Sequence, residues 1–177
     1  STGALLASHH DVDKVAFTGS TSVGKSILTA AQGNLKKVSL ELGGKSPNII
    51  FADADIEKAI VGAANAIFFN HGQCCCAGSR LFVAEKIYDQ VIEGVKAHAE
   101  KIICGVGMEK STQMGPLVSK EQFDRVTSYI KAGINDGAKA VCGGKSQGER
   151  GYFVEPTILA NTNKKMSVVS EEIFGPV

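Results

Sequence analysis

The sequence predicts an α/β protein built on a mostly parallel sheet that is covered by helices. Short apolar runs, which are typical of buried strands, alternate along the chain with longer segments whose apolar residues recur at helical spacing. The composition agrees, because 44% of the 177 residues are hydrophobic, which is ordinary for a globular protein with a real core. A chain of this length forms one domain or parts of two.

The individual elements follow from local patterns in chain order. Strands are predicted at residues 12–18, 37–42, 47–51, 80–84, 138–142, 153–159 and 168–169. Helices are predicted after the 19–26 turn to about residue 32, and at 55–68, 87–103 and 119 to about 135. Asp55 favours a helix start through its acidic side chain, and Ser119 with Gln122 forms a capping box.

The charge balance argues against several classes of partner. There are 19 Lys and Arg residues against 18 Asp and Glu, so the formal net charge is only +1 and predicts no nucleic-acid partner. No apolar stretch approaches the roughly 20 residues that span a bilayer, and the first residues lack the layout of a signal peptide. We therefore expect a soluble protein without a membrane partner.

The cysteines indicate a reducing, intracellular setting. There are five, three of them adjacent, and an odd number with this spacing makes a poor disulfide framework. Adjacent cysteines also lack the C-x₂₋₄-C spacing of zinc ligands, so no metal site is predicted.

Two stretches suggest nucleophilic catalysis. An apolar, helix-like run ends at Gly72 and leads into Cys74, Cys75 and Cys76, where small residues would let a substrate reach a thiolate. Upstream, Glu41 lies between leucines just before two glycines, and burial there would favour its action as a general base. By itself, a glutamate near the end of a strand is more often a solvated or paired carboxylate.

A third stretch, Gly19–Ser26, fits the phosphate-loop pattern G-x-x-x-x-G-K-S between a strand and a helix. In a nucleotide hydrolase, Lys25 would reach the terminal phosphates and Ser26 would hold Mg²⁺. Alternatively, the same turn is a helix N-terminus that receives the pyrophosphate of a dinucleotide. The second interpretation is favoured, because the hydrolase leaves Glu41 and Cys75 without a role.

These stretches together resemble the NAD(P)-dependent aldehyde dehydrogenase superfamily. The residues Glu41–Pro47 and Phe69–Gly78 resemble its two signature motifs, in the same order. The likeness extends from Val15–Ser20 to Glu171–Val177 at the end of the chain. The chain is therefore expected to be an internal piece of a longer subunit.

The resemblance implies a division near Gly43. Residues 1–43 would be the last strand–helix–strand of a Rossmann-like dinucleotide-binding domain. Residues 44–177 would be most of the catalytic domain, which bears the nucleophile.

The resemblance also implies the chemistry and the residues that carry it. An aldehyde would be oxidised to a carboxylate through a thiohemiacetal and a thioester on Cys75, with Glu41 as the base that activates water. The cofactor would be NAD, with NADP as the alternative. Its implied contacts are Gly19, Ser20, Val23, Gly24, Leu42, Glu172 and Phe174.

Several wider expectations follow from the same resemblance. The substrate would be a small aldehyde, and the longer protein would be a homodimer or homotetramer in the cytoplasm or an organelle matrix. The 177-residue piece alone is expected to be inactive, because most of the cofactor domain would lie outside it.

Overall fold

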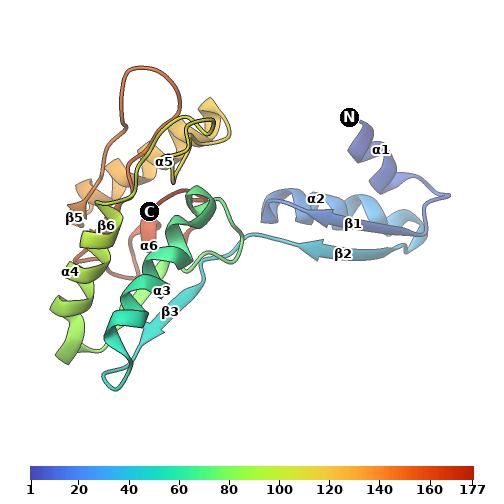
Figure 1. Cartoon of the computed structure of the whole chain (residues 1–177). Helices are drawn as coiled ribbons and strands as arrows, with labels where there is room; N and C mark the ends of the chain where they lie inside the picture. Colours follow the sequence, from blue (N-terminus) through green and yellow to red (C-terminus); the bar gives the residue numbers. More distant parts are fainter. The chain divides into compact units, whose positions relative to one another are not determined.

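The computed structural model describes all of residues 1–177, which divide into two compact units, residues 1–43 and residues 44–177. The division falls where the family resemblance predicts a domain boundary. The roles predicted for the two units remain predictions. Figure 1 shows the elements of each unit in chain order.

The first unit is a parallel strand pair joined by a helix. Its elements are α1 (Thr2–Ser8), β1 (Lys14–Thr18), α2 (Thr21–Ala31), the 3₁₀ turn η1 (Gln32–Asn34) and β2 (Lys37–Glu41). The register pairs Val15 with Val38 and Thr18 with Glu41. A β–α–β crossover of this kind brings the carboxyl ends of both strands to the same edge, next to the start of α2.

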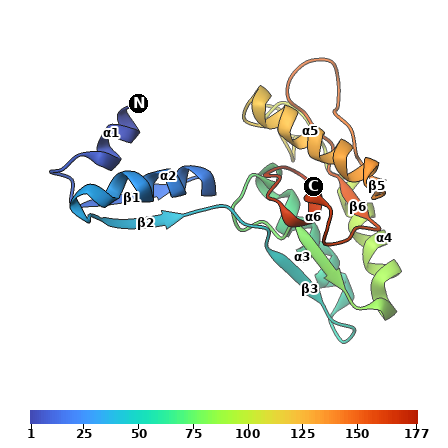
Figure 2. The same ribbon diagram turned by 180° about the vertical axis from the view of Figure 1, so that it is seen from behind.

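The second unit contains two further strand pairs and most of the helices. Its elements are β3 (Pro47–Ile50), α3 (Ile56–Phe68), η2 (Phe69–Gly72), β4 (Arg80–Val83), η3 (Glu85–Ile87), α4 (Tyr88–Ala99), α5 (Lys120–Asn135), β5 (Lys139–Cys142), β6 (Ile158–Ala160) and α6 (Ser167–Ser170). β3 and β4 are parallel, whereas β5 and β6 are antiparallel. Figure 2 shows the same arrangement from behind.

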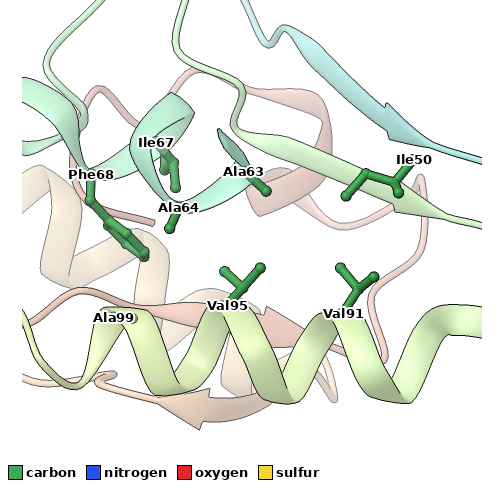
Figure 3. Close-up of a cluster of buried hydrophobic side chains, with 8 residues drawn as sticks. All are labelled: Ile50, Ala63, Ala64, Ile67, Phe68, Val91, Val95 and Ala99. Carbon is green, nitrogen blue, oxygen red and sulfur yellow. The ribbon is translucent and has the colours of Figure 1, made fainter. Parts of the chain in front are cut away.

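A core between α3 and α4 supports the segment that carries the cysteines. Asp55 caps α3 by accepting a hydrogen bond from Lys58 N, as its position in the sequence predicts. The buried side chains come from both helices and β3 (Figure 3): Ile50, Ala63, Ala64, Ile67, Phe68, Val91, Val95 and Ala99. Because Ile67 and Phe68 lie in the last turn of α3, this packing fixes the point where the cysteine turn begins.

A second core lies against α5 and holds the end of the chain. The Ser119 hydroxyl accepts a hydrogen bond from Gln122 N, which confirms the Ser119 half of the predicted capping box, while the Gln122 side-chain amide donates to Ile173 O and Phe174 O instead. Val126 and Ile130 of that helix are buried with Ile173. The residues after α6 are therefore packed on α5 rather than free.

Two predicted strands need correction, and one helix was not predicted. Residues 168–169 are not a strand but part of α6, where the N–H groups of Val169 and Ser170 bond to the Met166 carbonyl. The predicted 153–159 strand shrinks to β6, because the chain before it makes only an isolated bridge at Val154. The α1 helix has no counterpart in the prediction. No helix in the chain is both long and apolar enough to cross a membrane.

Candidate active site

The turn before the cysteines has an unusual backbone. Asn70, His71 and Gly72 follow one another with φ angles of 50°, 61° and 66°, in the left-handed region. Two non-glycine residues in succession rarely adopt this region, and such strain persists only where the surroundings enforce it. One local restraint is the Asn70 side chain, whose Nδ2 donates to Gln73 O at 3.0 Å.

The turn is also restrained by residues near the C-terminus, at Gly175. A Cβ on Gly72 would lie only 2.0 Å from Gly175 O and 2.5 Å from Gly175 C. Only a glycine lets the two backbones approach this closely. The cysteine turn is therefore in direct contact with the segment that carries Glu172 and Phe174.

The three cysteines differ in their surroundings. Cys75 and Cys76 are exposed and Cys74 is half-buried, with Cys74 Sγ 3.4 Å from Cys76 Sγ. Hydrogen bonds from the Cys76 backbone and thiol lower the pKa of Cys74, and the same contact raises the pKa of Cys76. The backbone N–H of Cys75 donates no hydrogen bond within the chain, so it is free to bind a substrate oxygen.

Glu172 and Phe174 lie in the same part of the second unit as the cysteine turn. Glu172 Oε1 accepts a hydrogen bond from Gly44 N at 3.2 Å, and a Cβ on Gly44 would lie 3.3 Å from Cys75 O. Phe174 has a φ of 60°, a further left-handed residue. The structure thus brings together Gly44, Cys75 and the Glu172–Phe174 segment, which are far apart in the sequence.

A half-buried lysine, Lys45, which the sequence patterns did not single out, lies beside these residues. Lys45 lines a small pocket together with Gly44, Cys74, Glu172 and Phe174. Burial, followed by the nearby Arg80 charge, lowers the pKa of Lys45 to about 8, while Glu172 acts in the opposite direction. In the sequence, the only sign that Lys45 belongs to this region is its position directly after Gly43 and Gly44.

The remaining predicted cofactor residues lie together in the first unit. Ser20 Oγ caps α2 by accepting a hydrogen bond from Val23 N at 3.3 Å. Gly19 N bonds to Glu41 O at 3.0 Å, and a Cβ on Gly24 would lie 2.7 Å from Leu42 Cδ2. This capped helix start beside a glycine fits a dinucleotide pyrophosphate, because small residues and free helix N–H groups favour an anion.

Glu41 does not have the buried setting expected from its leucine neighbours. Residues alternate along β2, so Leu40 is half-buried while Glu41 points to the opposite, exposed face. The expected desolvation is therefore absent within the first unit.

The backbone does not support the phosphate-loop interpretation of Gly19–Ser26. A phosphate loop needs an irregular segment whose N–H groups face the phosphates. Here α2 already begins at Thr21, and Gly24 N is bonded to Ser20 O at 3.0 Å as part of the helix. Lys25 and Ser26 are exposed helix residues. The nucleotide hydrolase alternative is therefore unsupported.

Comparison with known proteins identifies the family of the chain. The aldehyde dehydrogenase family model matches residues 1–177. The chain belongs to the aldehyde dehydrogenase family. It is 59% identical to an aldehyde dehydrogenase of Davidiella tassiana and 55% identical to the mitochondrial aldehyde dehydrogenase family 2 member B4 of Arabidopsis thaliana, with 99% of this chain covered in each case.

Solved structures of the family agree closely with the fold. The NAD⁺ complex of aldehyde dehydrogenase from Bacillus cereus has a TM-score of 0.98 and 52% identity, over 100% of this chain and 36% of that one. Betaine aldehyde dehydrogenase from Staphylococcus aureus, also solved with NAD⁺, has a TM-score of 0.94 and 41% identity, over 98% of this chain and 35% of that one. These matches confirm the predicted α/β class.

The chain spans about a third of its relatives' length. It covers 36% of the Davidiella tassiana protein and 33% of the Arabidopsis thaliana protein. A complete family subunit therefore contains a large part that this chain does not supply.

Proposed function

We propose that this chain supplies the nucleophile and part of the cofactor site of an NAD-dependent aldehyde dehydrogenase, with a small aldehyde as substrate. One observation carries the proposal. Within the second unit, Cys75 shares a contact region with Gly44 and Glu172, residues from three distant parts of the sequence. The family membership and the NAD⁺ complex of the Bacillus cereus relative support the choice of cofactor.

In the proposed reaction, the Cys75 thiolate attacks the aldehyde carbonyl and forms a thiohemiacetal. The free backbone N–H of Cys75 donates to the oxygen that becomes negative during the attack. Bound NAD⁺ supplies the hydride acceptor, and a thioester on Cys75 remains. Glu41 then takes a proton from the water that hydrolyses the thioester and releases the carboxylate.

The cofactor contacts divide between the two units. In the first unit, Gly19, Ser20, Val23, Gly24 and Leu42 would bind the pyrophosphate and adenosine side. In the second unit, Glu172 would bind the nicotinamide ribose hydroxyls and Phe174 would lie near the nicotinamide.

We further propose that the 177-residue chain is inactive by itself, whereas a complete subunit containing it is active. The test is a chimera in which residues 1–177 replace the matching third of the Bacillus cereus enzyme, which is 52% identical over this region. We expect the chimera to reduce NAD⁺ with an aldehyde, and Cys75→Ala to lower kcat by about a thousandfold or more. Cys74→Ala is the matched control and should retain activity within about tenfold.

Thiol labelling tests the nucleophile on the chain itself. A limiting amount of an electrophilic aldehyde analogue at pH 7, followed by fragmentation of the labelled peptide, distinguishes the three adjacent cysteines. Cys142 is an internal control, because burial raises its pKa to about 11 and leaves it protonated. Selective labelling of Cys75 would support its role. Preferential labelling of Cys74, whose pKa is lowered, would contradict the assignment.

A further inference from the structure

The segment from Glu171 to Gly175 is held by helix α5 through its backbone. Arg125 Nη2 donates to Glu172 O, and Arg125 Nε donates to Ile173 O at 3.4 Å. Gln122 Nε2 donates to Ile173 O at 3.0 Å and to Phe174 O at 2.6 Å. Side chains of α5 therefore satisfy the carbonyl groups of three consecutive residues, two of which are predicted cofactor contacts.

A tyrosine on the same helix face extends this set of contacts. Tyr129 OH donates to Glu171 Oε2, and the Arg125 guanidinium lies over the Tyr129 ring, 5.0 Å from its centre. Arg125 and Tyr129 are four residues apart, so they lie one above the other on the face of α5. Burial and the hydrogen bond to Glu171 raise the pKa of Tyr129, which keeps its hydroxyl protonated as a donor.

The backbone of this segment needs such restraint. Phe174 has a φ of 60°, and Gly175 lies against Gly72 of the cysteine turn. A non-glycine residue in the left-handed region stays there only when its surroundings hold it. The direction of the Glu172 side chain, which accepts from Gly44 N, depends on the same backbone.

We propose that Arg125 and Tyr129 are positioning residues for NAD⁺. They fix the main chain of residues 171–174, so that the Glu172 carboxylate and the Phe174 ring are oriented before the cofactor binds. The proposal rests on the proposed function, because Glu172 and Phe174 matter in this way only if they contact NAD⁺. It adds two residues that need not touch the cofactor.

The first test measures NAD⁺ affinity in the Bacillus cereus chimera by calorimetric titration without aldehyde. Tyr129→Phe keeps the ring and removes only the hydroxyl, so we expect the Kd for NAD⁺ to rise about threefold to tenfold. Arg125→Lys should have a similar effect, because a lysine keeps the charge but cannot bond two carbonyls in a fixed fork. Asp124→Asn on the same helix, whose partner is the exposed Lys120, is the matched control.

The kinetic pattern separates positioning from a general loss of structure. For Tyr129→Phe we expect KM for NAD⁺ to rise while the aldehyde KM and the thiol labelling of Cys75 stay unchanged. The double variant Tyr129→Phe/Glu171→Gln should be no worse than the poorer single variant, because both remove the same hydrogen bond. An unchanged Kd in Tyr129→Phe and Arg125→Lys would overturn the proposal.

A second measurement needs neither cofactor nor activity. Digestion of the 177-residue chain with a Glu-specific protease cuts after Glu171 and Glu172, and peptide mapping gives the rate at that site. We expect at least about threefold faster cleavage there in Tyr129→Phe but not in Asp124→Asn. If the chimera fails to bind NAD⁺, the proposed function fails, and the digestion still decides whether Tyr129 orders the segment. An unchanged rate would contradict that ordering.

Discussion

The two turns predicted to serve the active site are built in opposite ways. In the first unit, the turn at Gly19 and Ser20 is a regular helix start, in which Ser20 Oγ caps α2 by accepting a hydrogen bond from Val23 N. In the second unit, the turn before Cys75 contains three successive left-handed residues and is held against Gly175, a hundred residues away. The first turn follows local rules, while the second depends on a distant partner.

This difference bears on what each turn has to do. A helix start that presents free N–H groups to an anion needs only a small residue and a cap. A nucleophile must be fixed relative to groups from other parts of the chain, and this requires contacts between segments far apart in sequence. Strain in the cysteine turn, held in place by the Gly175 segment, is consistent with that second requirement.

The contrast between the two turns predicts its largest effect for Gly72→Ala. The new Cβ would lie 2.0 Å from Gly175 O, at a residue whose φ is +66°. Because the obstacle is backbone, neither side can move without breaking the contact, and we expect a loss of about 3 kcal/mol or more in the free energy of unfolding. Urea unfolding followed by circular dichroism measures this loss.

The matched control is Gly62→Ala in the middle of α3. Apart from the neighbouring backbone of its own helix, no atom lies within 4 Å of where its Cβ would be, and alanine favours a helix over glycine. We expect a gain of about 0.5–1 kcal/mol. If both variants changed stability equally, the contact between Gly72 and Gly175 would not be what holds the cysteine turn.

A second prediction concerns the half-buried charge of Lys45 beside the cysteine turn. Lys45 has a pKa lowered from 10.5 to about 8, chiefly by burial. Between these pH values the unfolded chain binds more protons than the folded chain, so stability should rise with pH across that window. Below pH 8 the cost is fully present, and Lys45→Met should raise the free energy of unfolding at pH 7 by about 1–2 kcal/mol after allowance for partial solvation.

Urea unfolding at pH 7 and pH 10 measures this effect. The rise in stability between the two pH values should disappear in Lys45→Met, whereas Lys58→Met, which changes an exposed lysine, should keep it. A rise that persists in Lys45→Met would assign the pH dependence to another group.

Much of the fold was predictable because it depends on local patterns. The caps at Asp55 and Ser119 define helix starts with a short-range hydrogen bond, and both are confirmed. The apolar spacing of α3 also predicts which face is buried, as Ala64 and Ile67 illustrate. These features need no knowledge of the rest of the chain.

Other features were not predictable because their causes are distant. Residues 168–169 have the β-branched composition of a strand, yet packing on α5 and bonds to Met166 make them helical. Nothing in the sequence near Tyr129 indicates its bond to Glu171, 42 residues later. The motifs thus name the candidate site residues, but the groups that hold them emerge only from the folded chain.

The smallest expected effect is in the first unit, where Gly24→Ala tests the same contrast between the two turns. Gly24→Ala places a Cβ 2.7 Å from Leu42 Cδ2. This distance is too short for a normal contact, as is the distance at Gly72. Here the obstacle is the end of a flexible side chain, and alanine also favours α2, so we expect a net change within about 0.5 kcal/mol. Hydrogen exchange of the β1 and β2 amides measures the stability of the first unit independently of the second. A loss comparable to that of Gly72→Ala would mean that the start of α2 is fixed by long-range packing too, and the contrast between the two turns would fail.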